Sequence, residues 1–264
     1  MFEKKKEFKL ITKKNPKSLL PNALTIFGVC LGLSSIKFAL DTNYAMAIIA
    51  IGFSAILDTL DGRVARLIKG TSDFGKELDS LTDFVSFGIA PAFVIYFWEL
   101  NKLGKIGWLI VLLFSVCCVL RLARFNLTKF DHNEQWKINF FEGIPSPAGG
   151  CLILFPLIFE LSNFSSFINL KTITPYLTVL VSFLLISKVP TFSFKKILIR
   201  RKMTIFLLLG VGLFFVSIIQ FTFETLTICC LVYSTLIPIG IYNYRLKLKN
   251  ANKFVDEEEH QDIL

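Results

Sequence analysis

Residues 46–98 read MAIIAIGFSAILDTLDGRVARLIKGTSDFGKELDSLTDFVSFGIAPAFVIYFW, a charged segment enclosed by two apolar stretches. The charged segment carries one pair of carboxylates three residues apart, Asp58 and Asp61, and a second pair four residues apart, Asp79 and Asp83. On helices each pair lies on one face, because residues three or four apart are neighbours on the helix surface. We therefore expect four carboxylates near the ends of two adjacent membrane-spanning helices.

Such a group of carboxylates needs a counter-charge. A charged side chain within a bilayer costs about 2.5–3.5 kcal/mol on the insertion scale, so four unpaired ones would cost on the order of 10–14 kcal/mol. No lysine or histidine on the two faces can neutralise all four, whereas Mg²⁺ and Mn²⁺ prefer oxygen ligands. We predict that Asp58, Asp61 and Asp79 bind such a cation and that Asp83 completes the site. The alternative is a loop of solvated surface acids, which two spaced pairs on adjacent helices disfavour.

Composition predicts the fold class. The chain has 264 residues, is 53% hydrophobic and has a mean hydropathy of +0.61, well above the balance of a soluble domain. Apolar segments of about 20 residues are long enough to cross a bilayer. We predict an all-α, polytopic membrane bundle with eight spans, at residues 19–39, 44–67, 77–98, 106–126, 146–162, 173–189, 204–220 and 225–244.

The predicted spans form one domain with a short polar segment at each end. A transmembrane domain over residues 19–245 follows a basic segment, 1–18, and precedes a charged tail, 246–264. Because the first 18 residues are basic and polar rather than apolar, we expect no cleavable signal peptide. We expect the acidic stretch Asp256–Glu259 to be solvated and disordered.

The net charge of +9 alternates along the chain. Lysines and arginines gather before the first span and after the second, fourth, sixth and eighth, whereas the loops between them carry few. By the positive-inside rule, both termini and the charged segment face the cytoplasm. We therefore expect a multi-pass protein of the cell (inner) membrane with its active site facing the cytoplasm. Its basic residues would favour anionic lipids of the bilayer, and we expect no nucleic-acid partner.

Cysteine and histidine chemistry finds little support. The six cysteines fall within predicted spans and show no CxxC spacing, which favours apolar packing. The two histidines, His132 and His260, have no GxSxG or HExxH context. Serine-triad hydrolysis and zinc catalysis are therefore poorly supported.

The charged segment also spells D-x2-D-G-x2-A-R-x8-G-x3-D-x3-D, which fixes eight positions over 26 residues. This pattern resembles the signature of the CDP-alcohol phosphatidyltransferases, integral membrane enzymes that move a phosphatidyl group from CDP-diacylglycerol to an alcohol. The resemblance implies direct in-line displacement without a covalent enzyme intermediate, with Asp83 as general base for the attacking hydroxyl. It also implies a homodimer.

Seven residues are predicted to bind CDP-diacylglycerol. Gly62 has no side chain, so the backbone there can approach a phosphate closely, and Ala65 keeps the same face open. Arg66 is a planar, permanently charged donor that suits a diphosphate. Helix–helix contact for Gly62 and membrane anchoring for Arg66 are the structural alternatives. The family resemblance adds Asn22 and Thr25, in a Pro-Asn-x-x-Thr segment, and Ser72 and Gly75.

Three further stretches of the sequence narrow the choice of acceptor alcohol. They are Thr71–Ala92, Leu120–Asn126 with Phe141–Ala148, and Lys188–Lys195, and together they resemble the membrane-bound phosphatidylserine synthases over roughly residues 19–200. That resemblance implies transfer to the hydroxyl of L-serine with release of CMP. The acceptor-binding residues that we predict are Arg121, Arg124, Glu142 and Ser146.

These acceptor assignments have alternatives. Arg121 and Arg124 share a helical face, and guanidinium groups beside a carboxylate would suit a zwitterionic amino acid, although both could instead be interfacial anchors. Glu142 could meet the ammonium group, but Asp73 or Glu77 could do so equally. Another acceptor, glycerol 3-phosphate or inositol phosphate, remains open, as does a cation-coupled transporter, which the signature glycines and arginine do not favour.

Overall fold

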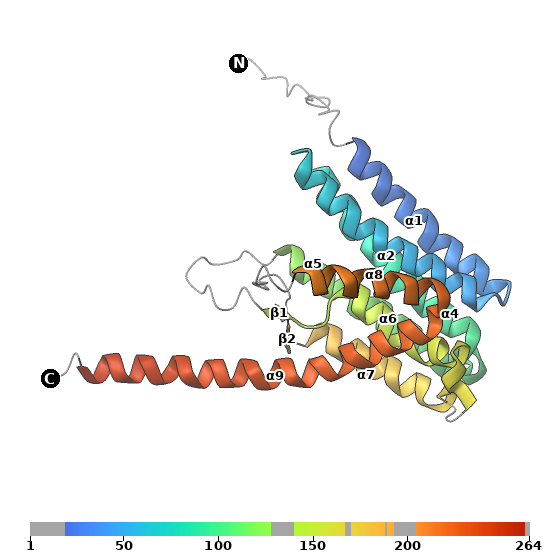
Figure 1. Cartoon of the computed structure of the whole chain (residues 1–264). Helices are drawn as coiled ribbons and strands as arrows, with labels where there is room; N and C mark the ends of the chain where they lie inside the picture. Colours follow the sequence, from blue (N-terminus) through green and yellow to red (C-terminus); the bar gives the residue numbers. More distant parts are fainter. Residues whose placement is uncertain (1–18, 128–139, 167–169, 188, 193–203, 262–264) are drawn as a thin grey trace, which may run out of the picture.

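The computed structural model describes residues 19–127, 140–166, 170–187, 189–192 and 204–261 (Figure 1). The predicted basic segment 1–18 lies outside this part. Within it the chain is almost entirely helical, which confirms the predicted polytopic membrane bundle. The main helices are α1 (Leu19–Leu40), α2 (Tyr44–Leu67), α3 (Asp73–Asp83), α4 (Ala90–Trp98), α5 (Lys105–Leu127), α6 (Ser146–Leu161), α7 (Thr174–Ile186), α8 (Thr204–Gln220) and α9 (Thr222–Gln261). Short 3₁₀ turns lie at Leu100–Leu103, Asn163–Ser166 and Lys171–Ile173.

An apolar helical segment is found at the position of each of the eight predicted spans. Among the described residues, five are long and apolar enough to cross a membrane: α1, α2, the run Asp73–Trp98, α5 and the first part of α9. Three shorter apolar helices occupy the positions of the fifth, sixth and seventh predicted spans.

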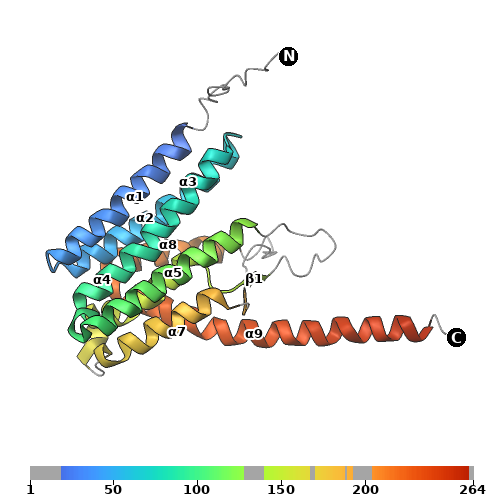
Figure 2. The same ribbon diagram turned by 180° about the vertical axis from the view of Figure 1, so that it is seen from behind.

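Helices α1 and α2 form a tight pair that leads into the carboxylate segment. They lie side by side in both opposed views (Figures 1 and 2). The Asn43 side chain begins α2 by accepting a hydrogen bond from the Met46 amide at 3.2 Å. Between the helices, Ser54 Oγ lies 3.0 Å from the Gly28 carbonyl oxygen, so small residues allow a close approach.

The third span is a composite of α3, a π-helical segment over Phe84–Ile89 and α4. It begins at Asp73, four residues before the predicted start at 77, because Ser72 caps α3 by accepting a hydrogen bond from the Gly75 amide at 3.0 Å. Ser86, within the π-helical segment, accepts a hydrogen bond from Ser54 at 2.8 Å. A Cβ at Gly32 would lie 2.9 Å from Ser86 Oγ, so α1 packs directly against this segment.

A short antiparallel pair, β1 (Phe140–Glu142) and β2 (Pro190–Phe192), joins the ends of α6 and α7. The sequence analysis did not predict it. Gly143 follows β1 with φ of +77°, and its amide donates to the Val189 carbonyl at 2.9 Å. A side chain there would also collide with the Ser187 carbonyl, so this turn requires glycine.

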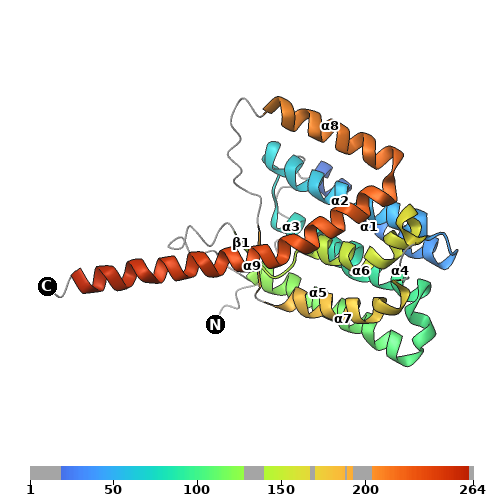
Figure 3. The same cartoon turned by 60° about the horizontal axis from the view of Figure 1, so that its bottom comes forward.

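The core lies among α2, the π-helical segment, α4, α5, α6 and α7, whereas α8 lies at the edge of the bundle. Phe87, Phe114, Leu154 and Leu185 are among its fully buried side chains. Helix α8 lies at the outside of the bundle (Figure 3). It contacts α9, and none of its own residues is buried.

Helix α9 is longer than the predicted eighth span. It runs for 40 residues through Gln261 and projects beyond the bundle in all three views (Figures 1 to 3). The prediction of a disordered acidic stretch at Asp256–Glu259 is therefore wrong, because these residues continue the helix.

Candidate active site at the carboxylate cluster

The structure brings three of the four predicted ligands together. Carboxylate oxygens of Asp58, Asp61 and Asp79 all lie within 4.8 Å of one another, with Asp58 and Asp61 on successive turns of α2 and Asp79 on α3. No ion pair within the described part of the chain reaches these three groups. Three oxygen donors converging without a protein cation fit a hard divalent ion.

Helix α1 orients one of these carboxylates. Thr25 Oγ1 donates a hydrogen bond of 2.6 Å to Asp61 Oδ2, and the same hydroxyl lies 3.0 Å from the Pro21 carbonyl oxygen. Both side chains are buried. Sequence reasoning assigned Thr25 only through the family resemblance and missed this contact, since nothing in local spacing links residues 36 positions apart.

A pocket of 260 Å³ opens beside the cluster. It contains every one of the seven residues that the sequence analysis assigned to CDP-diacylglycerol. The lining residues are Pro21, Asn22, Thr25, Asp61, Gly62, Ala65, Arg66, Gly70, Thr71, Ser72, Gly75, Lys76 and Asp79. The predicted nucleotide-binding residues and two of the predicted metal ligands thus share one cavity; their binding roles remain predictions.

Local geometry leaves this pocket open on one side. Apart from the chain neighbours and backbone of its own helix, no atom of the described residues lies within 4 Å of a Cβ placed at Gly62. The Arg66 Nε–H donates to the Gly62 carbonyl at 3.0 Å. A Cβ at Gly75 would lie 3.1 Å from Asn22 Oδ1, so a larger residue would crowd the Asn22 amide. Lys76 also lines the pocket; sequence reasoning missed it because a lysine at a helix start has an ordinary surface role.

Asp83 lies to one side of the three-carboxylate group. Its carboxyl interacts electrostatically with those of Asp58 and Asp79 and with the Arg121 guanidinium. Oxygen Oδ1 of Asp83 is buried and has no hydrogen-bond partner among the residues that the structure describes. Asp83 is therefore a carboxylate with a free acceptor atom at the border between the metal ligands and the arginine.

The two predicted acceptor-binding arginines have different surroundings. Arg121 donates a short hydrogen bond to Ser146 Oγ and stacks over the Phe125 ring at 5.5 Å. Arg124, one turn later, donates to the Ile186 carbonyl at 2.7 Å and to the Ser187 carbonyl at 3.3 Å, and so ties α5 to the end of α7. Arg121 thus links Ser146 to one of the four carboxylates, that of Asp83.

Two other residues bear on the acceptor assignment. Glu142 lies in β1, and its side chain lies outside the described part of the structure. Tyr233 on α9 has a buried hydroxyl that finds no hydrogen-bond partner in the described ranges of the chain, and it interacts electrostatically with Arg121. Sequence reasoning missed Tyr233 because a tyrosine in an apolar helix gives no signal that separates packing from binding.

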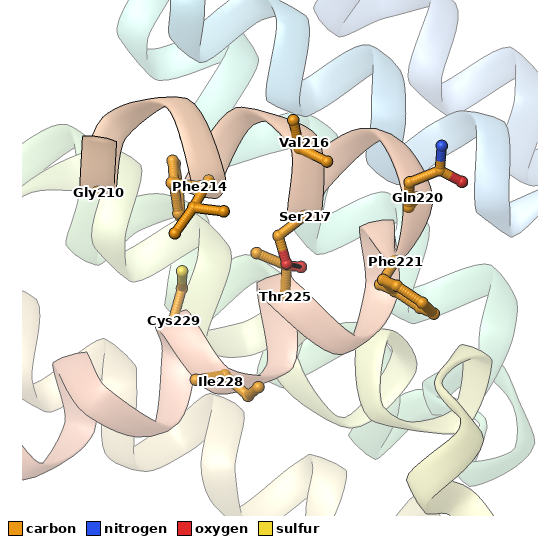
Figure 4. A pocket seen from close by; sticks show the side chains of 10 residues that line it. Gly210, Phe214, Val216, Ser217, Gln220, Phe221, Thr225, Ile228 and Cys229 are labelled. Carbon is orange, nitrogen blue, oxygen red and sulfur yellow. Dashed lines mark hydrogen bonds between the residues drawn. The ribbon is translucent and has the colours of Figure 1, made fainter. Parts of the chain in front are cut away.

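A second cavity, of 560 Å³, lies between α8 and α9 (Figure 4). Its polar side chains include Ser217 and Thr225, whose hydroxyl oxygens are 2.9 Å apart, and Gln220. Apolar residues such as Leu213 and Phe214 line the rest, and no carboxylate or basic side chain is among the lining residues. This cavity lacks the groups that phosphoryl chemistry requires.

Comparison with known proteins agrees with the site. The family model described as CDP-alcohol phosphatidyltransferase matches residues 18–184, and one described as CDP-alcohol phosphatidyltransferase 2 matches residues 202–238. The chain is similar to three proteins named CDP-diacylglycerol–serine O-phosphatidyltransferase. One, from Mycobacterium leprae, is 35% identical over 92% of this chain and 81% of its own length. Another, from Helicobacter pylori 26695, is 38% identical over 76% of this chain and 84% of its own.

The third relative, from Mycobacterium tuberculosis H37Rv, is 48% identical over 50% of this chain; the match spans 46% of that relative's length. The family match covers more than half of the chain and includes the carboxylate cluster and the adjoining pocket. The chain belongs to the CDP-alcohol phosphatidyltransferase family.

Proposed function

We propose that this protein transfers the phosphatidyl group of CDP-diacylglycerol to the hydroxyl of L-serine, forming phosphatidylserine and CMP. The observation that carries the proposal is the pocket in which the nucleotide-binding candidates adjoin the Asp58, Asp61 and Asp79 group. The names of the relatives at 35–48% identity support serine as the acceptor.

We assign the side chains of the pocket to the lipid substrate. Arg66 and Lys76 supply positive charge for the diphosphate, Gly62 leaves room for it, and Asn22 and Ser72 are polar groups for the cytidine end. Asp58, Asp61 and Asp79 hold Mg²⁺ or Mn²⁺, with Asp83 at the edge of the site. When bound, the cation supplies charge neutralisation for the diphosphate.

Asp83 accepts the proton of the attacking hydroxyl. The serine oxygen forms a bond to the phosphorus of the phosphatidyl group as the bond from phosphorus to the CMP oxygen breaks, so no covalent enzyme intermediate forms. The unpartnered Oδ1 of Asp83 is an acceptor within the site, which supports this role. Arg121 and Ser146 bind the serine, and Glu142 is a further candidate, whereas Arg124 holds the carbonyls at the end of α7.

The charge pattern of the loops indicates on which side of the membrane the active site lies. We propose that the active site faces the cytoplasm at the inner membrane, since the basic residues alternate between loops. We also propose a homodimer, on the family resemblance alone; its mass in detergent, measured by light scattering, tests that assignment.

The direct test is CMP release by the purified protein with CDP-diacylglycerol, in parallel with serine, glycerol 3-phosphate and inositol phosphate. We expect turnover with serine and none with the two phosphorylated acceptors. Turnover with a phosphorylated acceptor alone would replace serine but keep the family activity. Absence of CMP release with all three would overturn the proposal.

A second test addresses the cation. Activity should require Mg²⁺ or Mn²⁺ and vanish with EDTA, and Asp58→Asn should lower turnover at least about a hundredfold, because an amide carries no charge for the cation. Asp41→Asn, an exposed carboxylate between α1 and α2, is the matched control and should leave turnover unchanged. Full activity in a metal-free preparation would contradict the assignment of these ligands.

A further inference from the structure

Four helices bring polar groups together around Arg121. Asp83 comes from α3, Ser146 from the start of α6 and Tyr233 from α9. Arg121 donates to Ser146 and interacts electrostatically with both Asp83 and Tyr233. The proposed catalytic base and the Tyr233 side chain therefore both interact electrostatically with the same guanidinium.

This cluster contains two buried polar atoms without partners, Asp83 Oδ1 and the Tyr233 hydroxyl, within the described part of the chain. Buried polar atoms in native proteins are almost always hydrogen-bonded. Two unpartnered polar atoms that both belong to residues interacting with Arg121 therefore indicate a binding site for a ligand. Tyr233 otherwise packs against the apolar core, which fixes the position of its ring.

The hydrogen-bonding needs of these two atoms, Asp83 Oδ1 and the Tyr233 hydroxyl, define the chemistry of that ligand. A guanidinium only donates hydrogen bonds, so the phenol proton of Tyr233 needs an acceptor other than Arg121. A carboxylate accepts from both groups at once. Asp83 Oδ1 is an acceptor and needs a donor, such as a hydroxyl or an ammonium group. A small zwitterion with a hydroxyl group supplies both ends.

A phosphorylated acceptor fits less well. Arg121 contributes one positive charge and the phenol none, while Arg124 is engaged with the carbonyls at the end of α7. A phosphate carries close to two negative charges, and Asp83 stands nearby. The charge balance therefore favours a carboxylate.

We infer that Tyr233 is a specificity-determining residue whose hydroxyl binds the carboxylate of the acceptor amino acid together with Arg121. This inference rests on the proposed function, because it places serine between Arg121, Tyr233 and Asp83. It assigns the last described helix, α9, to the acceptor pocket.

The test compares serine with serinol, in which a hydroxymethyl group replaces the carboxylate. Tyr233→Phe removes the donor and keeps the ring. The serine KM should rise on the order of tenfold, as expected for a lost hydrogen bond to a charged group. The KM for CDP-diacylglycerol and the kcat/KM for serinol should not change.

Tyr242→Phe, on the same helix and 65% exposed, is the matched control and should behave as wild type. If serinol is not turned over, its inhibition constant against serine replaces kcat/KM.

The outcomes separate the two proposals. Equal losses with serine and serinol would assign Tyr233 a packing role and overturn the inference, as would an unchanged serine KM. Either result leaves the transferase activity of the wild-type protein standing. A wild-type protein that converts no serine overturns the proposed function, and the inference falls with it.

Discussion

Thr25 is a residue whose role extends from α1 to the proposed metal site. Its hydroxyl holds Asp61 Oδ2 at 2.6 Å, which fixes the orientation of one ligand of the cation. Partners of this kind typically contribute ten- to hundredfold to metal affinity. Thr25→Val keeps the shape of the side chain but removes the hydrogen bond.

We expect Thr25→Val to raise the Mg²⁺ concentration required for half-maximal activity by on the order of tenfold, with activity restored at saturating cation. The measurement is a Mg²⁺ titration of CMP release. Thr59→Val, an exposed threonine of α2 whose hydroxyl bonds its own helix, provides the control. An unaltered Mg²⁺ requirement would show that Asp61 needs no support from α1.

Arg121 and Arg124 form a matched pair on one helix. Arg121→Lys loses the planar geometry beside Ser146 while keeping the charge, so we expect a raised serine KM and little change in the CDP-diacylglycerol KM. Arg124→Lys instead weakens the link to the Ile186 and Ser187 carbonyls, so the melting temperature should fall with the serine KM nearly unchanged. Steady-state kinetics and thermal unfolding in detergent distinguish them; a raised serine KM in Arg124→Lys alone would reverse the assignment.

At this scale the sequence predicted which residue types form the site but not all of their contacts. The spacing of Asp58 and Asp61 and of Asp79 and Asp83 defined the helical faces, because helix geometry is local. The contact from Thr25 to Asp61 and the position of Tyr233 depend on how helices distant in sequence pack together, which spacing does not specify.

Among the elements, the bounds of α2 and α8 agree with the predicted spans 44–67 and 204–220. Apolar patterning and clear polar ends suffice for such helices. The π-helical segment and the β1–β2 pair were not predicted, since neither carries a distinctive pattern of residue types. The extension of α9 was not predicted, because a charged tail resembles a disordered segment in composition, although many charged residues favour helix.

The contact between α1 and the π-helical segment gives a prediction for elements. Gly32→Ala places a Cβ 2.9 Å from Ser86 Oγ and 3.2 Å from its Cα, so α1 must move away. We expect a loss of about 1–3 kcal/mol of stability, together with reduced activity. Thermal unfolding in detergent measures the first effect.

Gly52→Ala is the control for this substitution, since a Cβ at that position meets no described atom within 4 Å beyond its chain neighbours and its own helix backbone. It should retain wild-type stability. If Gly32→Ala is as stable as Gly52→Ala, the α1 contact does not constrain the π-helical segment.

For the whole molecule, the charge pattern predicts a topology that helix positions alone do not. Helix α2 separates Asp41 from Ser72, and its 24 residues are about 36 Å long at 1.5 Å per residue, enough to span the hydrocarbon core. We expect single cysteines at positions 72 and 41, in a variant lacking the native cysteines, to be labelled from opposite sides, with position 72 cytoplasmic. Labelling of both from one side would mean that α2 does not cross the membrane.

The π-helical segment between Asp83 and Ala90 has a consequence for the gene as well as for the fold. Each residue of an α-helix turns the chain by about 100°, so removing one residue here would rotate the carboxylate face of α3 relative to the packed face of α4. Every aspartate and nearly all of the hydropathy would survive such a change. An in-frame deletion of one codon in this stretch is therefore expected to be as damaging as the loss of a metal ligand, although every signature residue would still be encoded.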